Sequence, residues 1–259
     1  MISSRQNRRI KTIRGLRACK DEFAFLEGPH LVEELLGAGH ELLEVLVTPE
    51  FLATEAGRAL VDRLPKSLLV VTESVLTSIT EAATPQGVLA IAELPRSGVE
   101  VLPRVPGGVY LFLDRVQDPG NLGALARSAE ATSVAGMALA PGCAHPNHPR
   151  ALRASAGSLL RTPVAVGTDL DSVRAHLSAL SPAVVALDPE GGDDLYETEL
   201  EGCLVLVLGS EGSGLPAELR SQADLRITIP LAQPVESLNV AVAASVVLHE
   251  LARRRRADR

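Results

Sequence analysis

Short apolar runs alternate with amphipathic segments through the second half of the chain, and this alternation predicts strands separated by helices. The strand-like runs cover residues 109–113, 136–140, 184–187, 204–208 and, in a shorter form, 225–229. Short buried strands that alternate with helices favour a parallel sheet covered on both faces. Because ligands of such sheets bind beyond the carboxyl ends of the strands, we expect the chemistry in the segments that follow these runs.

The first half of the chain predicts a smaller α/β module. Its strand-like runs cover residues 42–47, 68–71 and 88–91, and its helical patterns cover residues 31–36, 52–64 and 74–79. Prolines and glycines interrupt every pattern between residues 94 and 108. The sequence therefore predicts an α/β protein with a smaller domain over residues 1–97, a linker over 98–108 and a larger domain over 109–259.

The composition narrows the class of protein. Apolar residues make up 46% of the 259 positions and charged residues 22%, which is typical of a globular protein and not of a disordered one. No apolar run approaches the roughly 20 residues that a membrane span requires, and no apolar stretch follows the basic N-terminus as in a secretory signal. Three widely spaced cysteines favour a reduced, cytoplasmic protein.

One of these cysteines precedes two histidines, in the order Cys143-x-His145-x-x-His148. Three prolines mark this segment as a loop, and the sequence offers no fourth ligand nearby. We therefore expect no metal site here.

Positive charge is concentrated at the two ends of an acidic chain. The first 20 residues hold seven Lys or Arg and no acid, and residues 253–259 hold five Arg and one acid. Residues 21–252 hold 13 basic and 31 acidic groups, a net charge of −18. Concentrated basic ends can bind nucleic acid locally although the whole chain is acidic. Because aromatic residues form only 2% of the chain, we expect contacts to phosphate and ribose more than base stacking.

The first chemical block follows the predicted strand 109–113. Pro119-Gly120 forces a turn there, and Asn121 is placed to cap the helix that follows. Helical side chains lean toward the start of their helix, so we expect Arg127 to lie over Gly123, close to Asn121. An amide and a cation at a helix start suit a phosphate group. A capped helix with a surface arginine explains the pattern equally well.

The second block is the glycine-rich segment Gly209-Ser210-Glu211-Gly212-Ser213-Gly214, which follows the run 204–208 directly. Such a loop leaves backbone N–H and C=O groups free to bind a ligand at close range. The glycine order is not that of a dinucleotide fingerprint, and the Lys-Ser/Thr pair of a phosphate loop is missing. An ordinary turn is the commoner explanation of this block alone.

The third block runs from Ile229-Pro230 to Ser237-Leu238-Asn239 and leads into residues 240–248, which carry no charge. A helix that is apolar all round must be buried on more than one side. We therefore expect it to pack on the sheet with one face and on a second subunit with the other. Ser237 and Asn239 stand at its start, where both can act as caps.

Together the three blocks resemble the SpoU/TrmH family of RNA ribose 2′-O-methyltransferases in the SPOUT superfamily. They match its motifs N-x-G-x-x-x-R, G-S-E-G and I-P…S-L-N in order and spacing. Residues 153–158 also resemble the family, and residues 26–29 and 84–88 look like its N-terminal substrate-binding domain of the ribosomal-protein-like α/β type. The chain departs from the family at Leu231, where members often have Met, and at Gln233-Pro234, where Gly is common.

The resemblance implies an enzyme that uses S-adenosylmethionine without a metal and folds its C-terminal domain around a deep trefoil knot, an exception among folds. It implies catalytic roles for Arg127, Asn121, Glu211, Ser237 and Asn239. It implies cofactor contacts from Leu208, Gly209, Glu211, Gly212, Ile229, Leu231, Leu238 and Asn239. We interpret Arg127 as a clamp for phosphate and for the developing alkoxide, because a guanidinium group is not deprotonated in proteins.

The resemblance also implies a homodimer formed by the final helix. The two-domain layout looks more like the branch that modifies ribosomal RNA than the compact branch that modifies tRNA. A tRNA methyltransferase, and a non-catalytic RNA-binding protein that keeps the fold, are the alternatives. A nucleotide hydrolase is disfavoured, because the chain has neither a phosphate loop nor a carboxylate pair for a metal.

Overall fold

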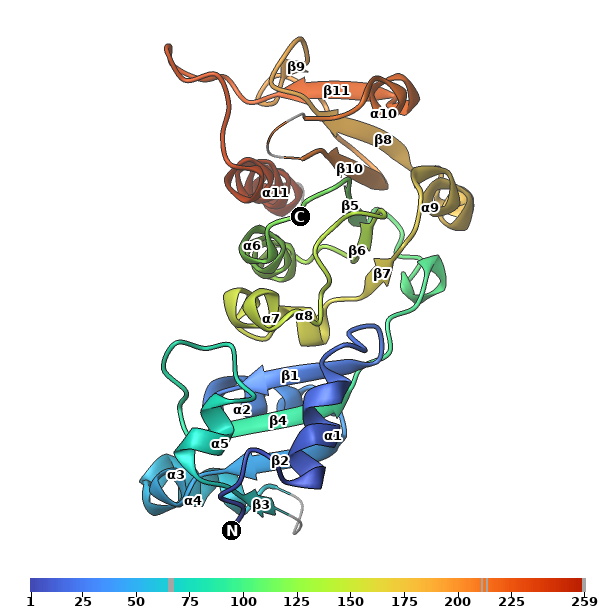
Figure 1. The fold of residues 1–259 in the computed structure, drawn as a ribbon. Coiled ribbons are helices and arrows are strands. Elements are labelled where there is room, and N and C mark those ends of the chain that lie inside the picture. The colour runs from blue at the N-terminus through green and yellow to red at the C-terminus, as the bar shows by residue number, and fades with distance from the viewer. Residues whose placement is uncertain (65–67, 211, 213, 258–259) are drawn as a thin grey trace.

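The computed structural model describes residues 1–64, 68–210, 212 and 214–257, and it contains two sheets (Figure 1). The N-terminal sheet has the strand order β1-β4-β2-β3. Its strands are β1 (Phe23–Glu27), β2 (Leu42–Val47), β3 (Leu68–Val70) and β4 (Val88–Glu93). Strand β4 is antiparallel to β1 and β2, whereas β2 and β3 are parallel.

Helices cover both faces of this sheet, because alternate strand residues are apolar on each side. Phe25 and Leu89 belong to a cluster with α1 (Arg8–Leu16) and α5 (Glu73–Thr77). Leu26 and Val88 belong to a second cluster that includes α2, α3 and α4. These three helices span Pro29–Gly37, Pro49–Ala53 and Glu55–Val61.

The C-terminal sheet is parallel throughout, with the strand order β7-β6-β5-β10-β8-β11-β9. Its strands are β5 (Val109–Leu113), β6 (Gly136–Leu139), β7 (Val164–Val166), β8 (Ala183–Leu187), β9 (Asp193–Asp194), β10 (Leu204–Leu208) and β11 (Leu225–Thr228). Its helices are α6 (Pro119–Ala131), α7 (Pro149–Ser155), α8 (Ser158–Arg161), α9 (Leu170–His176), α10 (Ala217–Gln222) and α11 (Val240–Ala257). The predicted α/β class with a parallel sheet is confirmed.

Each face of the parallel sheet has its own apolar cluster. Leu111 and Leu206 pack with residues of α6, α7 and α11, whereas Tyr110 and Val205 pack with residues of α9 on the opposite face. After β5 the chain builds β6 and β7 on one side and the remaining strands on the other (Figure 1). This reversal of direction is the position at which doubly wound sheets bind ligands.

Some local predictions are wrong. The helix predicted over residues 52–64 is split into α3 and α4 at Thr54, because Thr54 Oγ1 donates to Phe51 O at 2.7 Å and accepts from Gly57 N at 2.9 Å. Strand β1 and helix α1 were not predicted at all. The segment 94–108 contains a short 3₁₀ helix, Val99–Val101. The domain limits at residues 97 and 109, and the trefoil knot, stay predictions.

The two sheets share one apolar cluster. Leu26 and Leu35 of the N-terminal part belong to the same buried cluster as Leu152 and Leu159 of the C-terminal part, and all four are fully buried. None of the helices in the described part of the chain is long and apolar enough to cross a membrane.

Candidate functional site

A pocket of about 380 Å³ lies beyond the carboxyl ends of β8, β10 and β11. Seven of the residues predicted to form the site line it: Leu208, Gly209, Gly212, Ile229, Leu231, Ser237 and Leu238. They come from the second and third sequence blocks, which the parallel sheet brings to one edge. The pocket therefore lies beyond the carboxyl ends of the strands, where the sequence pattern predicts ligand binding.

Gly209 holds this pocket in shape through a close approach of two backbone segments. An ideal Cβ at Gly209 would lie 2.3 Å from both the carbonyl carbon and the oxygen of Gly214 and 2.5 Å from the nitrogen of Leu215. Ser210 and Gly214 also form an antiparallel bridge, with Gly214 N donating to Ser210 O at 3.0 Å. Only glycine fits at Gly209, so the loop offers backbone and not side chains to this part of the pocket.

The first and third blocks meet through two asparagines. Asn239 Nδ2 donates to Asn121 Oδ1 at 3.1 Å, and Asn239 Oδ1 accepts from the backbone N–H groups of Ala241 and Val242. The predicted cap of the last helix by Asn239 is therefore confirmed. Its neighbour Leu238 lines the pocket, so the asparagine pair lies directly beside the pocket wall.

The prediction that Asn121 caps the helix of the first block is wrong. Helix α6 begins at Pro119, and Asp118 is its cap: Asp118 Oδ1 accepts from Gly120 N at 2.6 Å and from Asn121 N at 3.1 Å. Proline is well tolerated in the first helical turn, so Pro119-Gly120 belongs to the helix and not to a preceding turn. The amide of Asn121 is left to bond Asn239 instead.

Arg127 lies on α6, roughly 9 Å along the helix axis from Asn121. Its side chain is exposed and forms no hydrogen bond or ion pair with another described residue. The expectation that it lies over an open Gly123 is wrong, because α7 fills that space: an ideal Cβ at Gly123 would lie 2.5 Å from Ala151 O and 2.6 Å from Ala154 Cβ. Arg127 is also absent from the described lining of the pocket.

Glu211, predicted for both catalysis and cofactor contact, lies outside the described residues. Ser237 is exposed and lines the pocket. The structure thus brings the second and third blocks into one pocket and joins the asparagines at its edge, with Arg127 further along α6.

Four charged residues that line the pocket are not among the predicted site residues, and two of them, Asp188 and Arg220, form a pair. Asp188, which follows β8 directly, is only 1% exposed, and its Oδ2 lies 3.2 Å from Arg220 Nε and 3.9 Å from Arg226 Nη1. Asp188 Oδ1 accepts from Glu190 N at 3.0 Å. A buried carboxylate needs such partners, so the pair fixes α10 against the pocket wall. A lone aspartate after a strand belongs to no motif, and the partner is 32 positions away, so only the structure identifies it.

The segment with one cysteine and two histidines has local structural roles. Cys143 Sγ donates to Leu113 O at 3.2 Å, and burial raises the pKa of this thiol to about 11. His148 Nδ1 accepts from Arg150 N as the cap of α7, and His145 Nε2 lies 3.1 Å from Asp21 Oδ1. Over the described ranges, no three His, Cys, Asp or Glu side chains gather as a metal site would require.

We expect His145 to make the fold sensitive to acid. Burial lowers the pKa of His145 below its usual value of about 6.5, and this outweighs the opposite influence of Asp21. The neutral ring is therefore favoured in the folded state, so its stabilising contribution is complete above about pH 6.5 and is lost as pH falls toward the lower folded pKa. We expect the melting temperature to fall less in His145→Gln than in the natural chain between about pH 7.5 and pH 5.5. Equal losses in scanning calorimetry would contradict this.

Comparison with known proteins agrees with this geometry. Residues 108–249 match the SpoU rRNA Methylase family, and residues 7–90 match the MRM3-like substrate binding domain. The chain is 31% identical over 260 residues to the 23S rRNA (guanosine(2553)-2′-O)-methyltransferase RlmP of Bacillus subtilis, covering 96% of this chain and 98% of that protein.

Two solved structures are similar over nearly the whole chain. The SpoU methyltransferase AviRb from Streptomyces viridochromogenes, in complex with AdoMet, has a TM-score of 0.88 at 26% identity and covers 96% of this chain and 98% of its own. The AdoMet-bound rRNA methyltransferase from Sinorhizobium meliloti has a TM-score of 0.82 at 32% identity, with coverages of 98% and 97%. These findings confirm the predicted methyltransferase class and its cofactor S-adenosylmethionine, and the chain belongs to the SpoU rRNA methylase family.

Proposed function

We propose that this protein methylates a ribose 2′-hydroxyl of 23S ribosomal RNA. The observation that carries the proposal is the pocket beyond β8, β10 and β11, with the Asn121–Asn239 pair at its edge. The name of RlmP supports 2′-O-methylation of 23S rRNA, and RlmP is similar over the N-terminal module as well as the catalytic one. The AdoMet complex of AviRb supports methyl transfer from this cofactor.

The pocket residues fit S-adenosylmethionine. Its volume of about 380 Å³ lies within the usual range for small-molecule sites. Leu208, Ile229, Leu231 and Leu238 offer apolar surface for an adenine ring, and the backbone around Gly209 offers hydrogen-bonding groups at close range. When bound, the cofactor supplies an electrophilic methyl group on a sulfonium.

The chain's own residues would position the ribose and stabilise charge. Alignment of the reacting atoms can supply roughly 7–11 kcal/mol of the barrier. Arg127 would hold an RNA phosphate and stabilise the negative charge that develops on the ribose oxygen while the hydroxyl proton passes to water. An exposed guanidinium without another described partner can bind an anion in this way. Asn121 and Asn239 would orient the ribose, and Ser237 and Glu211 are the remaining polar candidates.

One experiment tests this function. The protein is incubated with methyl-labelled S-adenosylmethionine and with unmodified 23S rRNA, 16S rRNA or tRNA, and modified riboses are mapped by resistance of the adjacent phosphodiester to alkali. We expect label in 23S rRNA only, at a ribose 2′-oxygen. Label in tRNA would favour the tRNA alternative, and cofactor binding without label in any RNA would favour the non-catalytic alternative.

Gly209 provides a direct test of the cofactor pocket. Because a Cβ would overlap the backbone of Gly214 and Leu215, Gly209→Ala is expected to weaken binding of S-adenosylhomocysteine by at least about tenfold. Gly37→Ala is the matched control, because an ideal Cβ there meets nothing within 4 Å. Isothermal titration calorimetry measures both affinities. Equal affinities would show that the pocket lies elsewhere.

We further propose that α11 forms a homodimer. Its residues Ala244, Val247 and Leu248 are buried against the rest of the chain, whereas Val242 is 50% exposed on the same apolar helix. A second copy would cover this surface, as an all-apolar helical segment requires. Sedimentation equilibrium of the purified chain measures the association directly.

The free cysteines fit a cytoplasmic site of action.

RNA contacts are assigned to the basic N-terminal end. Arg8 and Lys11 on α1 are exposed and form no side-chain hydrogen bond or ion pair within the described ranges. At the other end, Arg254 donates to the backbone oxygens of Leu195 and Thr198, and Arg255 donates to Gly202 O. Because these C-terminal arginines bind their own chain, we expect the N-terminal end to contact RNA more than the C-terminal end.

Charge substitution on α1 tests this assignment. Deleting residues 1–20 is unsuitable, because it would also remove the buried Ile10 and Ile13 from the core. In the double variant Arg8→Gln/Lys11→Gln we expect weaker RNA binding and a log K against log [salt] slope that is shallower by about 1.4, since each phosphate contact contributes about 0.7 for a single strand. Filter binding over a salt series measures the slope, and an unchanged slope would exclude these side chains from the RNA contact.

A further inference from the structure

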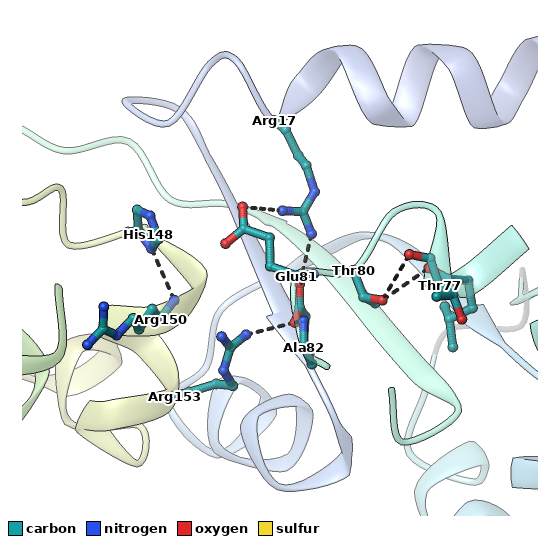
Figure 2. A network of polar contacts seen from close by, with 10 residues as sticks. Arg17, Thr77, Thr80, Glu81, Ala82, His148, Arg150 and Arg153 are labelled. Atoms are coloured by element: carbon teal, nitrogen blue, oxygen red, sulfur yellow. Dashed lines mark hydrogen bonds and ion pairs between the residues drawn. The ribbon is translucent and has the colours of Figure 1, made fainter. Parts of the chain in front are cut away.

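A buried carboxylate joins the two halves of the molecule. Glu27, the last residue of β1, is 7% exposed and accepts four hydrogen bonds. Figure 2 shows the residues that donate them, Arg17, Glu81, Ala82 and Arg153. Its Oε1 accepts from Arg17 Nη2 at 2.8 Å and from Glu81 N at 2.7 Å. Its Oε2 accepts from Arg153 Nη1 at 2.7 Å and from Ala82 N at 2.9 Å. All lone-pair directions of the carboxylate are therefore used.

Arg153 differs from the other three donors in origin. Arg17, Glu81 and Ala82 belong to the N-terminal module, and Arg17 is further fixed by the ring of Phe25, 4.7 Å from its guanidinium carbon. Arg153 belongs to α7 of the catalytic module. Three donors of the N-terminal module thus hold the Glu27 carboxylate in place. Arg153 reaches this carboxylate only when α7 occupies one defined position.

Helix α7 is in turn packed against the first turns of α6. The backbone of α7 approaches Gly123 so closely that an ideal Cβ would lie 2.8 Å from Ser155 N. Arg150 of α7 forms an ion pair of 3.1 Å with Asp118, the cap of α6. Asn121 lies in this same turn, so a shift of α7 moves the residue that meets Asn239 beside the pocket.

We propose that Glu27 and Arg153 are positioning residues for catalysis, which hold α7 and thereby set the place of Asn121 at the first turn of α6. This inference rests on the proposed function, in which Asn121 orients the ribose. Displacement of a reacting group by about 1 Å can cost about 100-fold in rate even when its cause is remote. The N-terminal module would thus act on the reaction and not only on RNA binding.

Other contacts hold the two modules together without Arg153. Arg161 of α8 pairs with Glu34 of α2 and with Glu130 near the end of α6. Asn147 Nδ2 donates to the backbone oxygens of Lys20 and Leu94 at 2.9 Å each. Loss of Arg153 therefore leaves the modules docked, which separates a positioning role from a purely structural one.

The test compares Arg153→Met with Arg161→Met. Both variants remove a charged contact between the modules and keep an aliphatic side chain. Of the two residues, only Arg153 lies on α7, the helix that packs against the first turns of α6. We expect Arg153→Met to lower kcat for rRNA by about 10–100-fold, with KM for RNA and the Kd of S-adenosylhomocysteine unchanged. Arg161→Met should keep kcat, and Arg153→Lys, which retains a positively charged donor group, should recover part of the kcat lost in Arg153→Met.

Hydrogen exchange gives a readout that does not depend on turnover. Amides of residues 120–124 should exchange faster in Arg153→Met than in the natural chain or in Arg161→Met. Equal exchange in the two variants, or a lower melting temperature of Arg153→Met with kcat unchanged, would overturn the inference. If the natural chain methylates no RNA, the proposed function fails, and the exchange comparison alone decides whether Glu27 and Arg153 position α6.

Discussion

Arg127→Ala is expected to lower kcat for rRNA methylation by at least about 100-fold, because removing one preorganised donor to a developing oxyanion has a cost of this size. The Kd of S-adenosylhomocysteine should not change, since Arg127 does not belong to the described lining of the pocket. Single-turnover kinetics with labelled cofactor measures the chemical step, and calorimetry measures cofactor binding.

The variant Arg127→Lys separates the effect of the positive charge from the effect of the guanidinium geometry. Lysine keeps the positive charge but lacks the fork of the guanidinium, so a phosphate clamp that uses two donors would be only partly restored. Arg174→Ala is a suitable control, because Arg174 forms an exposed ion pair with Asp224, 2.9 Å away, at no part of the proposed site. Turnover of Arg127→Ala at the level of this control would show that another group stabilises the transition state.

The second large effect is expected for Gly123→Ala. A Cβ at this position would overlap Ala151 O, Ala154 Cβ and Ser155 N, and backbone atoms cannot rotate away as a side chain can. Helices α6 and α7 must therefore separate, at a cost of about 1–3 kcal/mol in the free energy of unfolding. Because Asn121 lies on the displaced turn, kcat should fall as well.

Urea denaturation of Gly123→Ala, with Gly37→Ala as control, measures the first effect. Both substitutions gain the same helix-favouring methyl group, but the Cβ at Gly37 meets nothing within 4 Å, so only the overlap at Gly123 differs. If the two variants unfold at the same urea concentration, the backbone of α7 does not approach Gly123 closely enough to exclude a Cβ.

The sequence pattern predicts the parallel sheet well for a physical reason. Runs such as Val109–Leu113 and Leu204–Leu208 are buried at every position, so an unbroken apolar segment suffices to identify them. Helix α1 gives no such signal, because four of its nine residues are basic and only Ile10 and Ile13 are buried. The position of α1 depends on the sheet on which it packs, and no local sequence pattern predicts this packing.

The candidate site likewise contains residues that a local sequence pattern identifies and residues that only the folded structure identifies. Residues in the second and third blocks keep fixed spacing because each block follows one strand, and seven of the residues predicted for the site line the pocket. The sequence pattern predicts Asn121 as the cap of α6 because Pro119-Gly120 is typical of a turn, although proline also fits a first helical turn. Asp188 with Arg220, and Glu27 with Arg153, are pairs of distant residues that only the folded chain brings together.

The shared apolar cluster has a consequence for how this architecture can be divided. Leu26 and Leu35 pack in the same cluster as Leu152 and Leu159, so cutting the chain between the modules would expose apolar surface on both pieces. The substrate-binding module is therefore not an interchangeable attachment on a self-sufficient enzyme. We therefore expect the two modules to unfold as one cooperative unit, and an exchange of the substrate-binding module to change the RNA target would also require a redesigned surface between the modules.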